Sequence, residues 1–197
     1  MIIIGLTGSI GMGKSGASRE FRRLGVPLHD ADATVHRLME RGGAAVPILE
    51  RVFPQAVHDG RVDRPVLGKI VFDDPAALKK LEDIVHPLVR REERKFLQWC
   101  VRRRCPAAVL DIPLLFETGA DARCDIVITM TAPAFLQKQR VLRRPGMTEE
   151  RFKAILAKQM PDYEKRRRSD FVVSTGNGYR FSRDCLITIL ESVTADA

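Results

Sequence analysis

The chain has 197 residues, of which 45% are hydrophobic and 29% charged, with a formal net charge of +8 and a pI near 9.7. A chain of this length and composition can bury a full hydrophobic core, so we expect one domain with insertions. It lacks the run of about 18 apolar residues that a membrane span requires, and its first residues lack the charged leader of a signal peptide. These features predict a cytoplasmic protein with no membrane partner.

The cysteines and the positive charge narrow the classes of function. Cys100, Cys105, Cys124 and Cys185 form no C-x-x-C pair and have no histidine cluster beside them, which argues against a zinc site or a redox pair. A basic chain can bind nucleic acid through the phosphates. Here the arginines are spread over several predicted helices, with neither a recognition-helix motif nor interleaved aromatic residues. We therefore expect small polyphosphates as partners and no nucleic acid.

The chain begins with an apolar strand that leads into a glycine-rich loop. Residues 2–6 read Ile-Ile-Ile-Gly-Leu, which suits a central strand of a parallel sheet. Gly8 to Ser15 read Gly-x4-Gly-Lys-Ser, the pattern of the phosphate-binding loop of nucleoside triphosphatases and kinases. An amphipathic helix follows from Lys14 and ends at Gly25. The loop's N–H groups and the helix N-terminus then converge on one point, which favours a bound triphosphate such as that of ATP.

Each residue type of this loop has an expected role. Gly8 and Gly13 allow the tight backbone path. Lys14 is placed to reach the β- and γ-phosphates, and the Ser15 hydroxyl to hold Mg²⁺. The predicted nucleotide-binding set is Gly8, Gly11, Met12, Gly13, Lys14, Ser15 and Gly16.

A second short strand, residues 26–29, ends in Asp30-Ala31-Asp32. Ligands of open α/β sheets bind outside the carboxyl ends of the strands, so these acids are expected near the phosphate loop. Asp30 has two equally supported interpretations, a functional carboxylate or the N-cap of a helix over residues 33–40. For Asp32 we favour a role in the chemistry.

The next segment, from about residue 41 to 104, is predicted to be mostly helical and interrupts the strand-helix alternation. Pro65 and Pro75 occupy first helical positions, each with a capping aspartate close before it. One helix is predicted to end at Pro87, and the next runs from residue 88 towards 103. This insertion follows the second strand and its acids, so it is the natural place for a second substrate, the phosphoryl acceptor.

The sheet resumes at residues 107–110 and is followed by Asp111. An acid directly after a buried strand is typical of the second nucleotide motif, whose carboxylate holds Mg²⁺ directly or through water. After a strand over residues 125–130, an arginine-rich segment of about residues 133–168 lies where kinases carry a mobile lid. It is predicted to form two helices separated by Pro145-Gly146, with Thr148 as the N-cap of the second. A last strand at residues 171–173 and a closing helix complete five strands that alternate with helices. This order predicts an α/β fold of the phosphate-binding-loop (P-loop) kinase type, with a five-stranded parallel sheet, a helical insertion and a helical lid.

Taken together, these motifs resemble the dephospho-coenzyme A kinase family over nearly the whole chain. The resemblance implies ATP-dependent and Mg²⁺-dependent phosphorylation of the ribose 3′-hydroxyl of dephospho-coenzyme A, the last step of coenzyme A synthesis. It also implies three parts: a nucleotide core (1–32, 105–132 and 169–197), an acceptor domain (33–104) and a lid (133–168). The matching residues are Gly5-Leu6-Thr7-Gly8, Asp30-Ala31-Asp32, His86-Pro87, Asp111-Ile112-Pro113-Leu114-Leu115-Phe116-Glu117, Arg140, Gln159 and Ser169-Asp170-Phe171-Val172.

The resemblance also implies roles for individual residues. Asp32 would orient or deprotonate the acceptor hydroxyl, and Arg140 would close over the triphosphate. Lys14 completes the expected catalytic set, with Ser15 and Asp111 as the expected Mg²⁺-holding pair. The chain departs from the family pattern at Met12, where a small residue is common, and at Ser174-Thr175, where an asparagine is often found.

Two other functions compete with this interpretation. A nucleoside or nucleotide monophosphate kinase shares the sheet, the loop and the lid, but the helical insertion is long for that group and the run from Asp111 to Glu117 is not its pattern. A basic nucleotide switch or RNA-binding P-loop protein would use the positive charge instead. We expect a monomer whose partner is a small molecule.

Overall fold

The structure is a computed structural model that describes residues 1–72 and 74–195. The chain divides into two compact units. We call the unit that comprises residues 1–29 and those from 100 onward the core unit, and residues 30–99 the helical unit. Each is described by itself.

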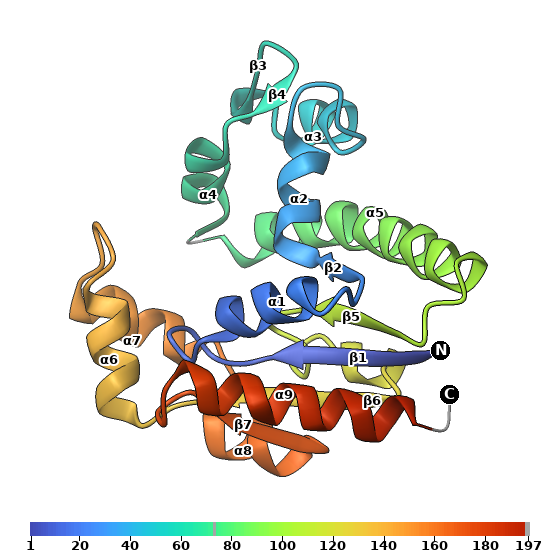
Figure 1. The fold of residues 1–197 in the computed structure, drawn as a ribbon. Helices are drawn as coiled ribbons and strands as arrows, with labels where there is room; N and C mark the ends of the chain where they lie inside the picture. Colours follow the sequence, from blue (N-terminus) through green and yellow to red (C-terminus); the bar gives the residue numbers. More distant parts are fainter. Residues whose placement is uncertain (73, 196–197) are drawn as a thin grey trace. The chain divides into compact units, whose positions relative to one another are not determined.

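The core unit is built on a five-stranded sheet with the strand order β2-β5-β1-β6-β7 (Figure 1). β1 pairs in parallel with both β5 and β6, and β6 pairs in parallel with β7. This confirms the predicted parallel α/β sheet. The strands are β1 (Ile2–Thr7), β2 (Leu28–Asp30), β5 (Ala107–Asp111), β6 (Ile126–Thr131) and β7 (Phe171–Ser174).

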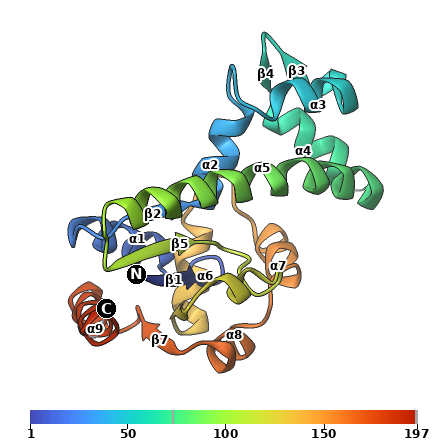
Figure 2. The same cartoon turned by 90° about the vertical axis from the view of Figure 1, so that its right-hand side faces the viewer.

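Helices cover both faces of this sheet. Ile128 and Met130 of β6 share a buried apolar cluster with residues of α1 (Lys14–Arg23) and α9 (Tyr179–Thr194). Side chains of successive strand residues point to opposite faces of the sheet. Thr131, the residue after Met130, therefore points to the other face, where its hydroxyl donates to Asp162 of α8 (Asp162–Arg168) at 2.7 Å. In Figure 2, β7 accordingly lies between α9 and α8.

The lid segment contains three helices where the sequence predicts two. α6 (Ala134–Leu142) ends before Pro145-Gly146, and Thr148 caps α7 (Glu149–Ala157) by accepting from Arg151 N at 3.3 Å. The short helix α8 follows Pro161 and was not predicted. Since the division into units leaves all three helices in the core unit, the boundaries of a separate lid stay a prediction.

The helical unit has its own apolar core, made by residues from all its helices and from a hairpin. The sequence analysis did not predict this hairpin, although its turn carries the signal Asp-Gly. Asp59 and Gly60 both have positive φ, 51° and 71°, as a type I′ turn requires. The elements are α2 (Ala31–Met39), α3 (Val46–Val52), a 3₁₀ turn (Pro54–Ala56), β3 (Val57–His58), β4 (Arg61–Val62), α4 (Arg64–Phe72) and α5 (Pro75–Arg102).

The predicted helix end at Pro87 is wrong, because Pro87 lies inside α5, a continuous helix of 28 residues. A proline inside a helix costs about 3 kcal/mol relative to alanine. Val85 before Pro87 is buried in an apolar cluster, and Leu88 and Val89 after it are partly buried and pack against that cluster. The burial of these side chains, at about 0.8 kcal/mol per CH₂ group removed from water, offsets the cost of the proline. The predicted caps at Asp63 and Asp74 are confirmed by their bonds to Val66 N and Ala77 N, each at 3.0 Å.

All four cysteines are free thiols. Cys100 is fully buried, and burial, with Cys105 beside it, raises the pKa of the Cys100 thiol to about 11, which makes it an unreactive core residue. Among the described residues, no helix combines the length and the apolar character that crossing a bilayer requires.

Candidate active site

The glycine-rich loop occupies the turn between β1 and α1, as predicted. Gly13 has φ +91°, and a Cβ added there would lie 2.8 Å from Thr175 Cγ2. A Cβ on Gly8 would lie 2.7 Å from the carbonyl oxygen of Met130. Both positions therefore require glycine, one for its backbone conformation and close contact and the other for contact with β6.

Lys14, the first residue of α1, forms an ion pair with Asp111. Asp111 ends β5 and is 3% exposed, and the register places it beside Leu6 near the end of β1. The hydroxyl of Ser18, one helical turn after Lys14, donates to the second carboxylate oxygen of Asp111. The predicted phosphate-binding lysine and the predicted metal-holding acid are thus brought together, and Ser15, which is exposed, is the next residue of α1 after Lys14.

The carbonyl groups of three consecutive loop residues bond to side chains from distant segments. Ile10 O accepts from Gln137 Nε2 at 2.8 Å, and Gly11 O accepts from Arg140 Nη1 at 3.4 Å. Met12 O accepts from the Thr175 hydroxyl at 3.0 Å.

These carbonyl contacts orient the loop's N–H groups. The C=O and N–H of a trans peptide unit point in opposite directions. The N–H groups of Gly11 and Gly13 therefore point away from Gln137 and Thr175, whereas Met12 N donates to Ser9 O at 3.1 Å. Two N–H groups that point away from the protein partners of the loop suit a bound anion.

Arg140 lies beside the loop but contacts protein groups. Its guanidinium donates to the Thr175 hydroxyl at 2.7 Å and to the Thr175 carbonyl at 2.9 Å, besides Gly11 O. The closure of Arg140 over a triphosphate stays a prediction. In the sequence, Thr175 is noted only as a departure from the family pattern. In the structure it connects Arg140 to the loop, and its side chain lies directly beside Gly13.

A second anchor of the loop is Gln159, whose Oε1 accepts from Ile10 N at 3.0 Å. The sequence analysis placed Gln159 in the lid without a role, and it gave Gln137 no role either. No local signal could have found these contacts, because the partners are 149 and 127 residues apart in the chain. The 6% exposure of Gln137 shows that this polar side chain is directed inward.

In the helical unit, Asp30 at the end of β2 and Asp32 in α2 take different positions. Asp30 Oδ1 accepts from Ala33 N at 2.9 Å, which confirms its interpretation as the N-cap of α2. Asp32 lies in the first turn of α2 with an exposed side chain. The placement of Asp32 beside the phosphate loop stays a prediction.

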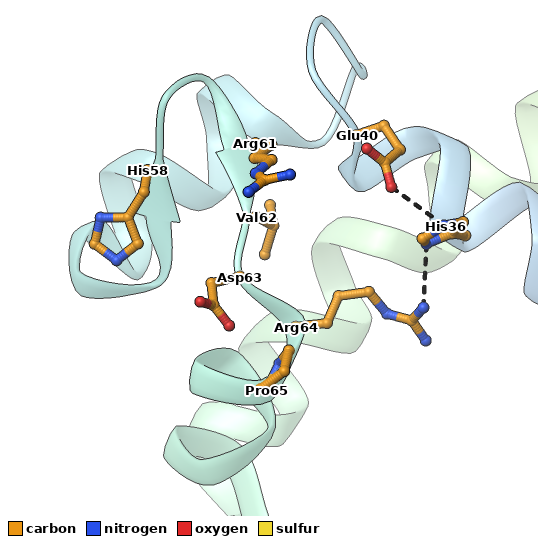
Figure 3. Close-up of a pocket in the computed structure, with 8 residues that line it drawn as sticks. All are labelled: His36, Glu40, His58, Arg61, Val62, Asp63, Arg64 and Pro65. Atoms are coloured by element: carbon orange, nitrogen blue, oxygen red, sulfur yellow. Dashed lines mark hydrogen bonds and ion pairs between the residues drawn. The ribbon is translucent and has the colours of Figure 1, made fainter.

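The helical unit also contains a pocket of about 680 Å³ that the sequence analysis did not predict (Figure 3). The Arg64 side chain extends from the start of α4 towards α2, where its Nη1 lies 3.1 Å from His36 Nδ1. His36 Nε2 lies 3.1 Å from Glu40 Oε1. The lining residues are His36, Glu40, His58, Arg61, Val62, Asp63, Arg64 and Pro65.

A glycine-rich loop between β1 and a helix, a lysine at the start of that helix and an acid at the end of the neighbouring strand define a P-loop phosphotransferase. Solved structures share this fold. The match to TT1252 from Thermus thermophilus has a TM-score of 0.86 with 39% identity and covers 97% of each chain. A shikimate kinase from Acinetobacter baumannii, 17% identical with a TM-score of 0.56 over 100% of this chain and 94% of that one, shares the fold alone.

Sequence comparisons identify the family. A family model described as dephospho-CoA kinase matches residues 2–180. The dephospho-CoA kinase of Mesorhizobium japonicum is 54% identical over 98% of this chain and 97% of its own length. That of Paramagnetospirillum magneticum is 63% identical over 84% of this chain and 78% of its own. The chain belongs to the dephospho-CoA kinase family.

We predict that Gly13→Ala lowers ATP affinity roughly 5- to 150-fold, because an alanine at this positive φ costs about 1–3 kcal/mol and its Cβ meets Thr175, so the loop leaves the conformation that binds phosphate. Isothermal titration with ATP measures the effect, and circular dichroism checks the fold. The matched control is Gly68→Ala in α4, where nothing lies within 4 Å of the added Cβ. Unchanged affinity in Gly13→Ala would contradict the assignment of the loop.

Proposed function

We propose that this chain transfers the γ-phosphoryl group of Mg²⁺-ATP to the ribose 3′-hydroxyl of dephospho-coenzyme A, giving coenzyme A and ADP. The observation that carries this proposal is the phosphate loop with Lys14 held at Asp111, in a chain that belongs to the dephospho-CoA kinase family. We further propose that it acts as a cytoplasmic monomer on this small acceptor, without nucleic acid or membrane, since both substrates are small molecules.

The core unit supplies the positive potential for the triphosphate. The first turn of α1, all of whose residues are described, has no acidic side chain, and no side chain of the described residues caps its N-terminus. Gly16 N and Ala17 N bond to the Gly13 carbonyl, so the N–H groups of Lys14 and Ser15 are the ones that would bind phosphate oxygens, together with those of the loop. The Lys14 ammonium adds a full charge at the same point, where it would stabilise the transferring phosphoryl group.

Ser15 and Asp111 fit a Mg²⁺ ion that arrives with ATP. Both offer the hard oxygen ligands that Mg²⁺ prefers, and one carboxylate is enough because the ion keeps waters and binds phosphate oxygens. Within residues 1–72 and 74–195, no group of three or more His, Cys, Asp or Glu side chains could hold a metal alone. Bound Mg²⁺ would neutralise charge on the β- and γ-phosphates. Asp111 would then exchange Lys14 for the ion and leave the ammonium free for the phosphates.

We propose that the helical unit binds the acceptor, through Asp32 and the pocket of Figure 3. Asp32 and His36 are one turn apart on α2, a rise of about 6 Å, so their side chains share one helix face. With the ribose 3′-hydroxyl at Asp32, the diphosphate on the same sugar can reach His36 and Arg64. The arginine fork suits this diphosphate, and Asp32 would accept the hydroxyl proton as general base.

The substrate specificity is tested by a coupled ADP-release assay with Mg²⁺-ATP. We expect ADP with dephospho-coenzyme A and no comparable turnover with AMP, CMP or adenosine, and a product with a new 3′-phosphate. Turnover with the monophosphates would favour a nucleotide kinase. ATP turnover that needs no acceptor, with salt-dependent RNA binding, would favour the nucleotide switch.

We predict that Asp32→Asn lowers kcat roughly 10²-fold or more, the range expected for losing a general base, while the dissociation constant of ATP changes little. Steady-state kinetics with dephospho-coenzyme A and calorimetric titration with ATP measure the two quantities. The control is Asp83→Asn, an exposed aspartate of α5 paired with Lys79, which should retain wild-type kinetics. A collapse of ATP binding in Asp32→Asn would identify Asp32 as a metal or structural residue instead.

A further inference from the structure

Lys165 of α8 is a lysine whose side chain is wholly buried, at 0% exposure. Its Nζ lies 2.8 Å from Glu117 Oε1 and donates to the Pro113 carbonyl at 3.3 Å. Removing an ammonium group from water costs several kcal/mol even in a real protein, so a lysine is buried in charged form only with such partners. This site is not needed to bind ATP or the acceptor in the mechanism above.

One side of this ion pair reaches the strands that carry the phosphate site. The Pro113 carbonyl that accepts from Lys165 also accepts from the Thr7 hydroxyl at 3.1 Å. Thr7 ends β1, directly before the glycine-rich loop, and Pro113 lies two residues after Asp111. Lys165 and Thr7 thus share one acceptor between the ends of β1 and β5.

The other side of the pair reaches the lid. Glu117 Oε1 accepts from Met160 N at 2.8 Å, besides its contact with Lys165. Met160 follows Gln159, whose side chain holds Ile10 N of the phosphate loop. Glu117 Oε1 therefore binds segment 159–165 near its start, at Met160, and at its end, at Lys165. The same segment contacts the phosphate loop through Gln159.

Stability alone does not account for this arrangement. A buried ion pair is often no more stabilising than an apolar pair of the same volume, because desolvation offsets the attraction. What an apolar pair would lack is the set of directional bonds to Met160 N and the Pro113 carbonyl. The bond to Met160 N holds the segment whose Gln159 contacts the phosphate loop, and the bond to the Pro113 carbonyl holds the segment that follows Asp111.

We propose that the Glu117–Lys165 ion pair is a positioning device for phosphoryl transfer, which fixes the phosphate loop relative to the Asp111 carboxylate. It rests on the proposed function, in which ATP and Mg²⁺ bind at those two places. Because a displacement of about 1 Å can cost up to 10²-fold in rate, loss of the pair slows transfer without any contact to the substrates. Glu117 and Lys165 are positioning residues and do not touch the reacting atoms.

The test replaces the pair by apolar residues in the double variant Glu117→Leu/Lys165→Met, which leaves no unpaired buried charge. We expect a folded protein whose melting temperature is close to that of the wild type. Its kcat should fall about tenfold or more, and the Mg²⁺ concentration for half-maximal rate should rise several-fold. Calorimetric titration with a non-hydrolysable ATP analogue and Mg²⁺ gives the same comparison without turnover. The control is Arg167→Met, an exposed position on the same helix, which should match the wild type.

Glu117→Gln/Lys165→Met is the second variant, because it also leaves no unpaired buried charge and keeps a side-chain oxygen at position 117 that can accept from Met160 N. It should show the same changes in kcat and Mg²⁺ dependence to a smaller degree. Folded variants with wild-type kcat and wild-type Mg²⁺ dependence would overturn the proposal and leave the pair a purely structural contact. A wild-type protein without dephospho-coenzyme A kinase activity would instead refute the proposed function, so the two failures are distinguishable.

Discussion

The ion pair between the Lys14 ammonium and the Asp111 carboxylate is the interaction on which the phosphate site depends. It joins the first residue of α1 to the last residue of β5, and Ser18 adds a bond from the next turn of the same helix. Asp111 is almost fully buried, so it must keep a cationic partner or a metal ion. We infer that it holds Lys14 in place before the nucleotide binds and accepts the metal afterwards. In the proposed function, the same contact would serve both folding and chemistry.

The surrounding residues hold the loop in a conformation that suits phosphate. Gln137, Arg140 and Thr175 bind three consecutive carbonyl groups of the loop, and as a consequence the Gly11 and Gly13 N–H groups face the other way. This network is preorganised, which is the property that electrostatic catalysis needs, since no dipole has to turn during the reaction. Thr175 has two functions, because it bonds to Met12 O and fills the space beside Gly13.

Much of this fold can be predicted from local sequence. The apolar strands, the glycine-rich loop and the caps at Asp63, Asp74 and Thr148 each depend on neighbours within a few residues, and all were found. The continuous helix through Pro87 could not be predicted, because it depends on a shared apolar core that outweighs a local penalty. Contacts such as Gln137 to Ile10 or Lys165 to Glu117 join residues that are far apart in the chain, and no periodicity encodes them. The β3-β4 hairpin is different, because its Asp-Gly turn is a local signal that by itself predicts a hairpin.

The most direct test of the central claim is a double-mutant cycle of Lys14→Ala and Asp111→Asn, measured as kcat with Mg²⁺-ATP and dephospho-coenzyme A. If the two side chains act as one unit on the phosphates and the metal, each single variant loses about 10²- to 10³-fold, the range for one preorganised electrostatic contact. The double variant then loses little more than the worse single variant. Losses that multiply in the double variant would contradict this account, because they would show that Lys14 and Asp111 act independently.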